Sequence, residues 1–223
     1  MDFTMPFPDY RLIGKELSYD FCHSKIPTED RERISRQAWG IGADAARELF
    51  CAEQGLYDFV KIAGAYGLRI DKIDKDYIVG NRRCFSDYFP KQKCVRLYLR
   101  SIALWSGQNR LDTDAATQLI LSHEFFHYLE YTKLGPTSRI YRAPALTIGK
   151  LRIGRVGVRA LSEIGAHAFA RTYYELASCE SREQASHVSR ELVSCESREQ
   201  ASCASHKLAS CESRERVSCE SHT

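Results

Sequence analysis

Two histidines one helical turn apart, with a glutamate directly after the first, are the residues in this 223-residue chain best placed to do chemistry. They form the run His123-Glu124-Phe125-Phe126-His127, which has the pattern H-E-x-x-H. On a helix, side chains four positions apart share one face, with about 5–6 Å between their Cβ atoms, so both imidazoles can bind one zinc ion. Glu124 is offset by about 100° and can instead reach a water molecule beside the ion, as a general base.

A catalytic zinc needs a third protein ligand, which must come from outside this run. Glu130, one turn beyond His127, is expected to be exposed or to support a ligand rather than to bind the ion. Residues 158–176 predict a second helix that is apolar nearly all round, where a carboxylate is unfavourable unless paired or bound to metal. We therefore predict Glu163 as the third ligand. His167, one turn later, could replace Glu163 as the ligand, or orient it or the bound intermediate from the second shell.

Each site residue also has a purely structural interpretation. The histidines could be buried core residues, with Glu124 on the surface. Glu163 could instead form a salt bridge with Arg159 or Arg171. Convergence of two imidazoles and a carboxylate on one point in space would distinguish a metal site from these alternatives.

The elements that must position these residues predict an α+β fold: N-terminal helices, a small three-stranded sheet, then the histidine helix and the glutamate helix. The first helix is expected to open at Thr28, with a hydroxyl cap and a possible break near residues 40–42, and a second covers residues 56–66. Alternation of apolar and polar residues predicts half-buried strands at residues 68–73, 76–80 and 94–100. The histidine helix is expected over residues 115–133, and small residues between 165 and 170 would let the glutamate helix approach it closely.

Three segments are expected along the chain. Residues 1–27 predict an irregular N-terminal arm, residues 28–177 a domain that carries the candidate metal site, and residues 178–223 a low-complexity tail. The tail repeats with a period of 16 and a weaker period of 8, and each unit holds too few aliphatic residues to build a core, which favours disorder or transient helix. Its cysteines and histidines could bind soft metals, but their spacings do not converge on one site.

Composition and charge favour a cytoplasmic protein. The formal net charge is only +3, so neither direct nucleic-acid binding nor membrane binding is indicated. No apolar run approaches the roughly twenty residues of a membrane-spanning helix, and the first residues do not resemble a signal peptide. The nine cysteines contain no C-x-x-C pair and are expected to be free thiols.

The segments HEFFHYLE and, downstream, SEIGAHAFA together resemble the ImmA/IrrE-type zinc metallopeptidases, in which H-E-x-x-H is followed by E-x-x-A-[NH]-x-F-A. The resemblance covers roughly residues 34–177. It implies a zincin-like fold of the gluzincin type, Zn²⁺ held by His123, His127 and Glu163, and Glu124 as the base. It also implies an intracellular endopeptidase with a protein or peptide substrate, which in several relatives is a helix-turn-helix transcriptional repressor.

The chain departs from this family at three points, which bear on specificity more than on metal binding. Phe126 stands where glycine is frequent, and His167 stands where asparagine is usual. The step from His127 to Glu163 is 36 positions and includes a basic, glycine-spaced run at residues 148–155 that could form a hairpin over the cleft. Two other functions stay open: a non-catalytic repressor-binding protein on a zincin scaffold, and a zinc hydrolase of small amides.

Overall fold

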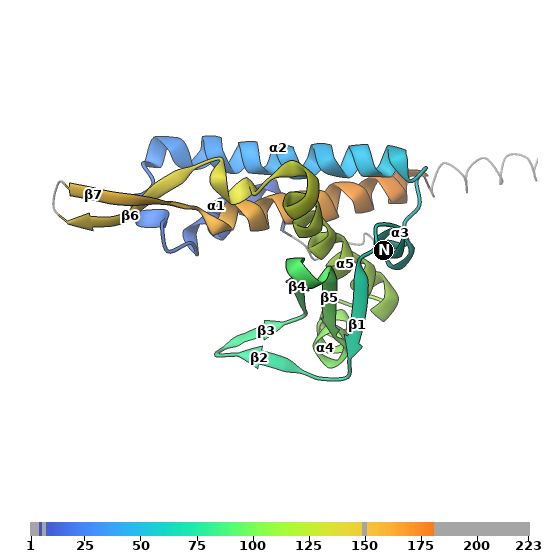
Figure 1. Ribbon diagram of the computed structural model, residues 1–223. Coiled ribbons are helices and arrows are strands. Elements are labelled where there is room, and N and C mark those ends of the chain that lie inside the picture. The colour runs from blue at the N-terminus through green and yellow to red at the C-terminus, as the bar shows by residue number, and fades with distance from the viewer. Residues whose placement is uncertain (1–4, 6–7, 149–150, 181–223) are drawn as a thin grey trace, which may run out of the picture. The chain divides into compact units, whose positions relative to one another are not determined.

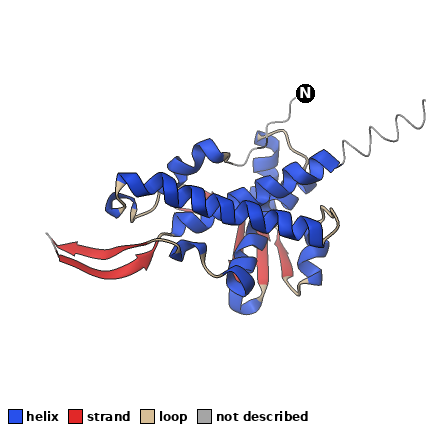
Figure 2. Ribbon diagram, turned by 90° about the horizontal axis from the view of Figure 1, so that it is seen from above, coloured by secondary structure: helices blue, strands red, loops and turns tan. Residues whose placement is uncertain are grey.

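The computed structural model describes residue 5, residues 8–148 and residues 151–180, and the chain divides into two units, residues 1–177 and residues 178–223. In the first unit helices pack around small sheets, so the predicted α+β class is confirmed (Figures 1 and 2). The disorder or transient helix predicted for the tail concerns residues that, from 181 onward, lie outside the described part of the chain. Among the residues that are described, none of the helices has the length and apolar character needed to cross a membrane.

Residues 8–27 differ from the irregular arm expected of them, because they form short helical elements that pack on the core. These elements are two 3-10 turns, Tyr10–Leu12 and His23–Lys25, and α1, Ile13–Ser18. Leu17 and Ile26 are almost fully buried. Asp20 accepts a 2.9 Å hydrogen bond from the backbone N–H of Ala160, which ties this segment to the start of a later helix.

α2 (Thr28–Ala52) runs without the break expected near residues 40–42, and Thr28 is its first residue rather than its cap. Gly42 lies where the helix of residues 159–180 passes α2: a Cβ atom on Gly42 would lie 2.0 Å from the carbonyl oxygen of Gly165. Figure 1 shows the two helices side by side, in blue and orange. α3 (Phe59–Ala65) follows, capped by Asp58.

The sheet nearest the candidate site has the strand order β1-β5-β4. β1 (Arg69–Ile73) and β5 (Cys94–Tyr98) are parallel, and β4 (Ser86–Phe89) pairs antiparallel with β5. The predicted middle strand, β2 (Tyr77–Val79), instead forms a separate hairpin with β3 (Arg82–Cys84), so β4 takes the place expected for it. β5 is buried along nearly its whole length, so the half-buried strand predicted at residues 94–100 is wrong: neither of its faces is open to solvent.

The helix that carries the histidines is α5 (Thr113–Leu129), which follows α4 (Leu99–Gln108). Asp112 caps α5 by accepting hydrogen bonds from the backbone N–H groups of Asp114 and Ala115. The helix widens into a π-helical turn, Glu130–Leu134, and ends at Gly135, whose φ of 78° suits glycine. The sequence therefore placed both ends of this helix within about two residues, the usual scatter of helix boundaries.

β6 (Arg142–Ile148) and β7 (Leu151–Gly157) form the antiparallel hairpin that the glycine spacing suggested, although residues 149 and 150 at its turn are not described. Figures 1 and 2 both show it projecting away from the helices of its unit. Its described residues line none of the cavities that contain His123. The hairpin is therefore present but does not cover that site.

The close approach of α2 to the later helix predicts opposite effects of one substitution at two neighbouring glycines. Gly42→Ala should lower the free energy of unfolding by about 1–3 kcal/mol, because its methyl group meets the backbone of Gly165. Gly40→Ala should raise it by about 0.5–1 kcal/mol, because nothing lies within 4 Å of a Cβ there and alanine favours helix. Urea denaturation of both variants measures the two changes, and equal effects would contradict the contact.

Candidate metal centre

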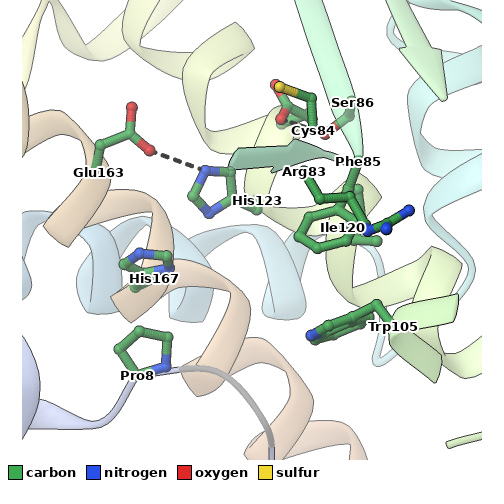
Figure 3. Close-up of a pocket in the computed structure, with 11 residues that line it drawn as sticks. Pro8, Arg83, Cys84, Phe85, Ser86, Trp105, Ile120, His123, Glu163 and His167 are labelled. Carbon is green, nitrogen blue, oxygen red and sulfur yellow. Dashed lines mark hydrogen bonds and ion pairs between the residues drawn. The ribbon is translucent and has the colours of Figure 1, made fainter. Parts of the chain in front are cut away.

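Two imidazoles and one carboxylate from separate helices meet at the surface of α5. Nε2 of His123 lies 3.3 Å from Oε2 of Glu163, and Nε2 of His127 lies 3.9 Å from Oε1 of the same carboxylate. Figure 3 shows Glu163 and His123 pointing toward each other across the gap between their helices. The structure thus brings together the three residues predicted as metal ligands.

The donor set of this triad suits zinc. One ligand atom from each residue can be chosen so that all three lie within 4.8 Å of one another. Ligand atoms about 2.0–2.2 Å from a shared zinc ion are separated by no more than about 4 Å, so a small side-chain rotation closes the triad around an ion. Three protein ligands leave a fourth tetrahedral position open, as in catalytic rather than structural zinc sites.

Glu130 supports His127 through Nδ1, which is the second of the two roles expected of it. It is buried, and its Oε2 accepts a 2.9 Å hydrogen bond from Nδ1–H of His127. The hydroxyl of Ser162 and the backbone N–H of Thr137 donate to the same carboxylate. With Nδ1 engaged in this way, Nε2 is the ring nitrogen that faces Glu163, which is the arrangement that orients metal-binding histidines.

The charges around the triad shift the pKa values of its members. Burial lowers the pKa of His127, but the hydrogen bond to Glu130 and the nearby carboxylates of Glu163 and Glu124 outweigh it and raise this pKa to about 9. Burial would raise the pKa of Glu163, yet His123 and His127 hold it far below its usual range. Burial and the neighbouring His123 lower the pKa of His167 to about 3. These shifts mark a compact group of acids and imidazoles, a common feature of functional sites.

Glu124, the predicted base, is buried against the edge strand of the sheet. Its Oε1 accepts a 2.6 Å hydrogen bond from the hydroxyl of Ser86 in β4. The strand therefore fixes the carboxylate of Glu124 on the same side of α5 as His123. Sequence reasoning did not find Ser86, because β4 carries no alternating pattern that would have identified it as a strand.

Two adjoining cavities open on the triad. One, of about 360 Å³, extends toward Pro8 and Trp105; the other, of about 580 Å³, extends toward Ser138 and Arg159. Both are lined by His123, Glu124 and Glu163, together with Cys84 at the end of β3 and Ser86 at the start of β4. The candidate centre therefore lies between two hollows rather than at the bottom of one closed pocket.

His167 lies next to the ligands, with its ring centroid 5.0 Å from that of His123, and it lines the first cavity. Tyr128 and Tyr173 are poorly placed to stabilise an oxyanion, because both donate their hydroxyls to backbone carbonyls. Tyr88, which the sequence did not suggest, lines the second cavity, and burial raises the pKa of its hydroxyl to about 12. That hydroxyl is buried and makes no hydrogen bond within the described part of the chain.

The structural alternatives for these residues are weakened by their partners. Arg171, one predicted partner of Glu163, pairs with Glu175 instead. The two motif histidines converge on a carboxylate rather than on core side chains. The five described cysteines are all free thiols, as expected, and none belongs to the triad.

Comparison with known proteins adds no relative: no family model, no curated protein and no solved structure matches this chain. The assignment of the centre therefore rests on its own geometry and on the motifs that form it.

Removal of the Glu130 carboxylate should weaken metal binding without removing a ligand. We expect Glu130→Gln to lower the affinity for zinc about 10–100-fold, because His127 loses the acceptor that orients it. Ser162→Ala should have a smaller effect in the same direction, since Glu130 keeps its other donors. Competition with a fluorescent zinc chelator measures both. Parent-like affinity in Glu130→Gln would show that the carboxylate only supports the fold.

Zinc affinity should depend on pH through His127. In the metal-free protein the pKa of this residue is about 9, so at neutral pH zinc must displace a proton. Affinity should therefore rise as the pH rises and level off above about 9, and calorimetry in two buffers of different ionisation enthalpy should detect the released proton. In Glu130→Gln the plateau should begin at lower pH. An affinity that is constant from about pH 6 to 9 would contradict a protonated His127.

Proposed function

We propose that this protein is a zinc-dependent endopeptidase that hydrolyses a peptide bond in a protein substrate. The observation that carries the proposal is the convergence of His123, His127 and Glu163 on one point. Beside them lies Glu124, which is not one of the three ligands and is held in place by a hydrogen bond from Ser86. A site that only stored zinc would have no use for Glu124 at the open side of the centre. In a purely structural zinc site, a fourth protein ligand would also be expected to fill the remaining coordination position.

The resemblance to the ImmA/IrrE-type peptidases and a zincin-like fold are part of this proposal. The order of elements supports both, since the sheet of β1, β5 and β4 precedes the histidine helix and the glutamate helix follows it. The departure at Phe126 has a local compensation. Its ring packs against Gly165, where a Cβ would come within 2.7 Å of it, so a missing side chain on one helix makes room for the large one on the other.

The residues of the centre have separate roles in hydrolysis. His123, His127 and Glu163 would hold the ion, which when bound polarises the substrate carbonyl and lowers the pKa of water. Glu124 takes a proton from the attacking water and then passes it to the amine of the leaving peptide. Ser86 keeps the carboxylate of Glu124 on the side of the attacking water. Tyr88 or His167, one in each cavity, donates to the developing oxyanion.

The two cavities favour an extended substrate over a small amide. The two cavities extend from the triad in different directions, one toward Trp105 and the other toward Ser138. Both are lined by Ser86 of β4, the edge strand of its sheet. An extended peptide could cross the triad with residues on both sides of the cleaved bond, whereas a small amide would need only one hollow. A protein substrate fits this arrangement, and by the resemblance it could be a transcriptional repressor, as for several ImmA/IrrE-type peptidases.

Glu124→Gln tests the mechanism directly. The variant should bind zinc with parent-like stoichiometry and lose about 10²–10⁴-fold in cleavage rate, because it keeps the ligands but has no base. Glu48→Gln, which alters an exposed carboxylate on α2, is the matched control and should cleave normally. Metal content per chain and cleavage of a quenched fluorescent peptide library measure the two properties. Cleavage by Glu124→Gln at the parent rate would refute the mechanism, and zinc binding without cleavage by the parent would favour a binding protein.

A further inference from the structure

The stretch between the two halves of the centre has an unusual charge. Residues 131–162 contain seven lysines and arginines and no aspartate or glutamate, whereas the whole chain has a formal charge of only +3. This stretch contains β6 and β7, the hairpin that projects from the helices of its unit (Figure 2). The positive charge of the chain is thus concentrated on one protruding element and the segments that connect it.

Three cations of this stretch, together with Lys25, surround one cavity at the base of the hairpin. The cavity has a volume of about 540 Å³, and its lining includes Lys25, Arg139, Arg142 and Arg155. The three arginines are exposed, and no acidic side chain among the described residues lines the cavity. Lys25 donates a 2.6 Å hydrogen bond to the backbone carbonyl of Ala145, which fixes the lysine against β6. Such a concave, positively charged surface attracts carboxylates or phosphates.

The same face of the hairpin carries an apolar pair next to the cavity. Leu146 and Ile153 are cross-strand partners, and their relative exposures are 51% and 46%. Since residues two apart on a strand share a face, they lie on the face of Arg142 and Arg155. On the opposite face, Ala143 at the base of the hairpin is fully buried, whereas Ala145 further out is exposed. The outer face therefore presents cations at the base of the hairpin and aliphatic side chains further out.

We propose that this face, defined by Arg139, Arg142, Arg155, Leu146 and Ile153, binds an acidic, amphipathic segment of a protein partner. Acidic side chains of that segment would occupy the cation-lined cavity, and its apolar side chains would cover the aliphatic pair. Phosphates of a nucleic acid would satisfy the cations but would leave Leu146 and Ile153 against a charged backbone. The exposed pair is what favours a protein segment.

This binding is independent of the metal centre. The described residues of the hairpin line neither cavity at His123, so the partner would bind without contacting the ligands. A chelator should therefore leave the interaction unchanged. That control also separates binding at the hairpin from binding of a peptide in the cleft beside Glu124.

A synthetic peptide provides the test. The probe is a fluorescent peptide of alternating glutamate and leucine flanked by uncharged polar residues, and its binding to the full chain is followed by anisotropy. We expect saturable binding that weakens with added salt, and about fivefold weaker binding of a peptide in which serine replaces leucine. A short duplex DNA of equal charge should bind more weakly than the glutamate-leucine peptide. Tighter binding of the DNA, or no saturable binding of the peptide, would overturn the proposal.

Two pairs of variants locate the site. Arg142→Gln combined with Arg155→Gln should weaken peptide binding about tenfold, whereas Lys72→Gln with Lys91→Gln, which removes the same charge from exposed positions elsewhere, should not. Leu146→Thr with Ile153→Thr should weaken it about fivefold, whereas Ile78→Thr with Val79→Thr, at the equally exposed pair on β2, should not. Equal losses in a hairpin variant and its control, or loss of binding with a chelator, would place the peptide elsewhere.

Discussion

The candidate centre depends on one close contact between helices. Gly165 lies between α2 and α5, with no room for a Cβ beside the ring of Phe126, while Gly42 leaves no room for one beside the Gly165 carbonyl. Glu163 is two residues before this contact, so the approach of the backbones determines how far its carboxylate reaches toward the histidines. A larger residue at either glycine would move the helix outward. The ligand geometry therefore follows from a steric constraint located beside the centre rather than in it.

The carboxylates around His127 make the candidate centre favourable for a cation. Glu124, Glu130 and Glu163 are gathered within reach of His127, and their charges outweigh burial in raising its pKa. Without metal, protonation of the His127 imidazole partly balances the negative charge of the three carboxylates. A divalent ion at the triad would replace that proton, and Glu130 would then stabilise the neutral ligand through Nδ1. The same carboxylates can thus support both states.

The sequence predicted the ligands better than their surroundings, for physical reasons. His123 and His127 follow from the period of one helix, and Glu163 from the unfavourable burial of a carboxylate in an apolar helix. The partners Ser86 and Ser162 could not be found in this way, because they come from other elements and a serine has no distinctive pattern. The supporting role of Glu130 could be predicted from helix spacing, because it stands at i+3 from His127. Its burial could not be predicted in this way. The strand order failed because β4 is short and its residues do not alternate.

The hairpin and the centre are joined by hydrogen bonds at the two ends of the basic stretch. Before β6, the backbone N–H of Thr137 donates to Glu130, the carboxylate that orients His127. After β7, the N–H of Val158 donates a 2.9 Å bond to the carbonyl of Ser138, which closes the base of the hairpin. Ser162, one turn further on, returns to Glu130. The segment between His127 and Glu163 is therefore closed by hydrogen bonds at both ends. The hydrogen bonds to Glu130, which orients His127, also hold the base of the β6–β7 hairpin.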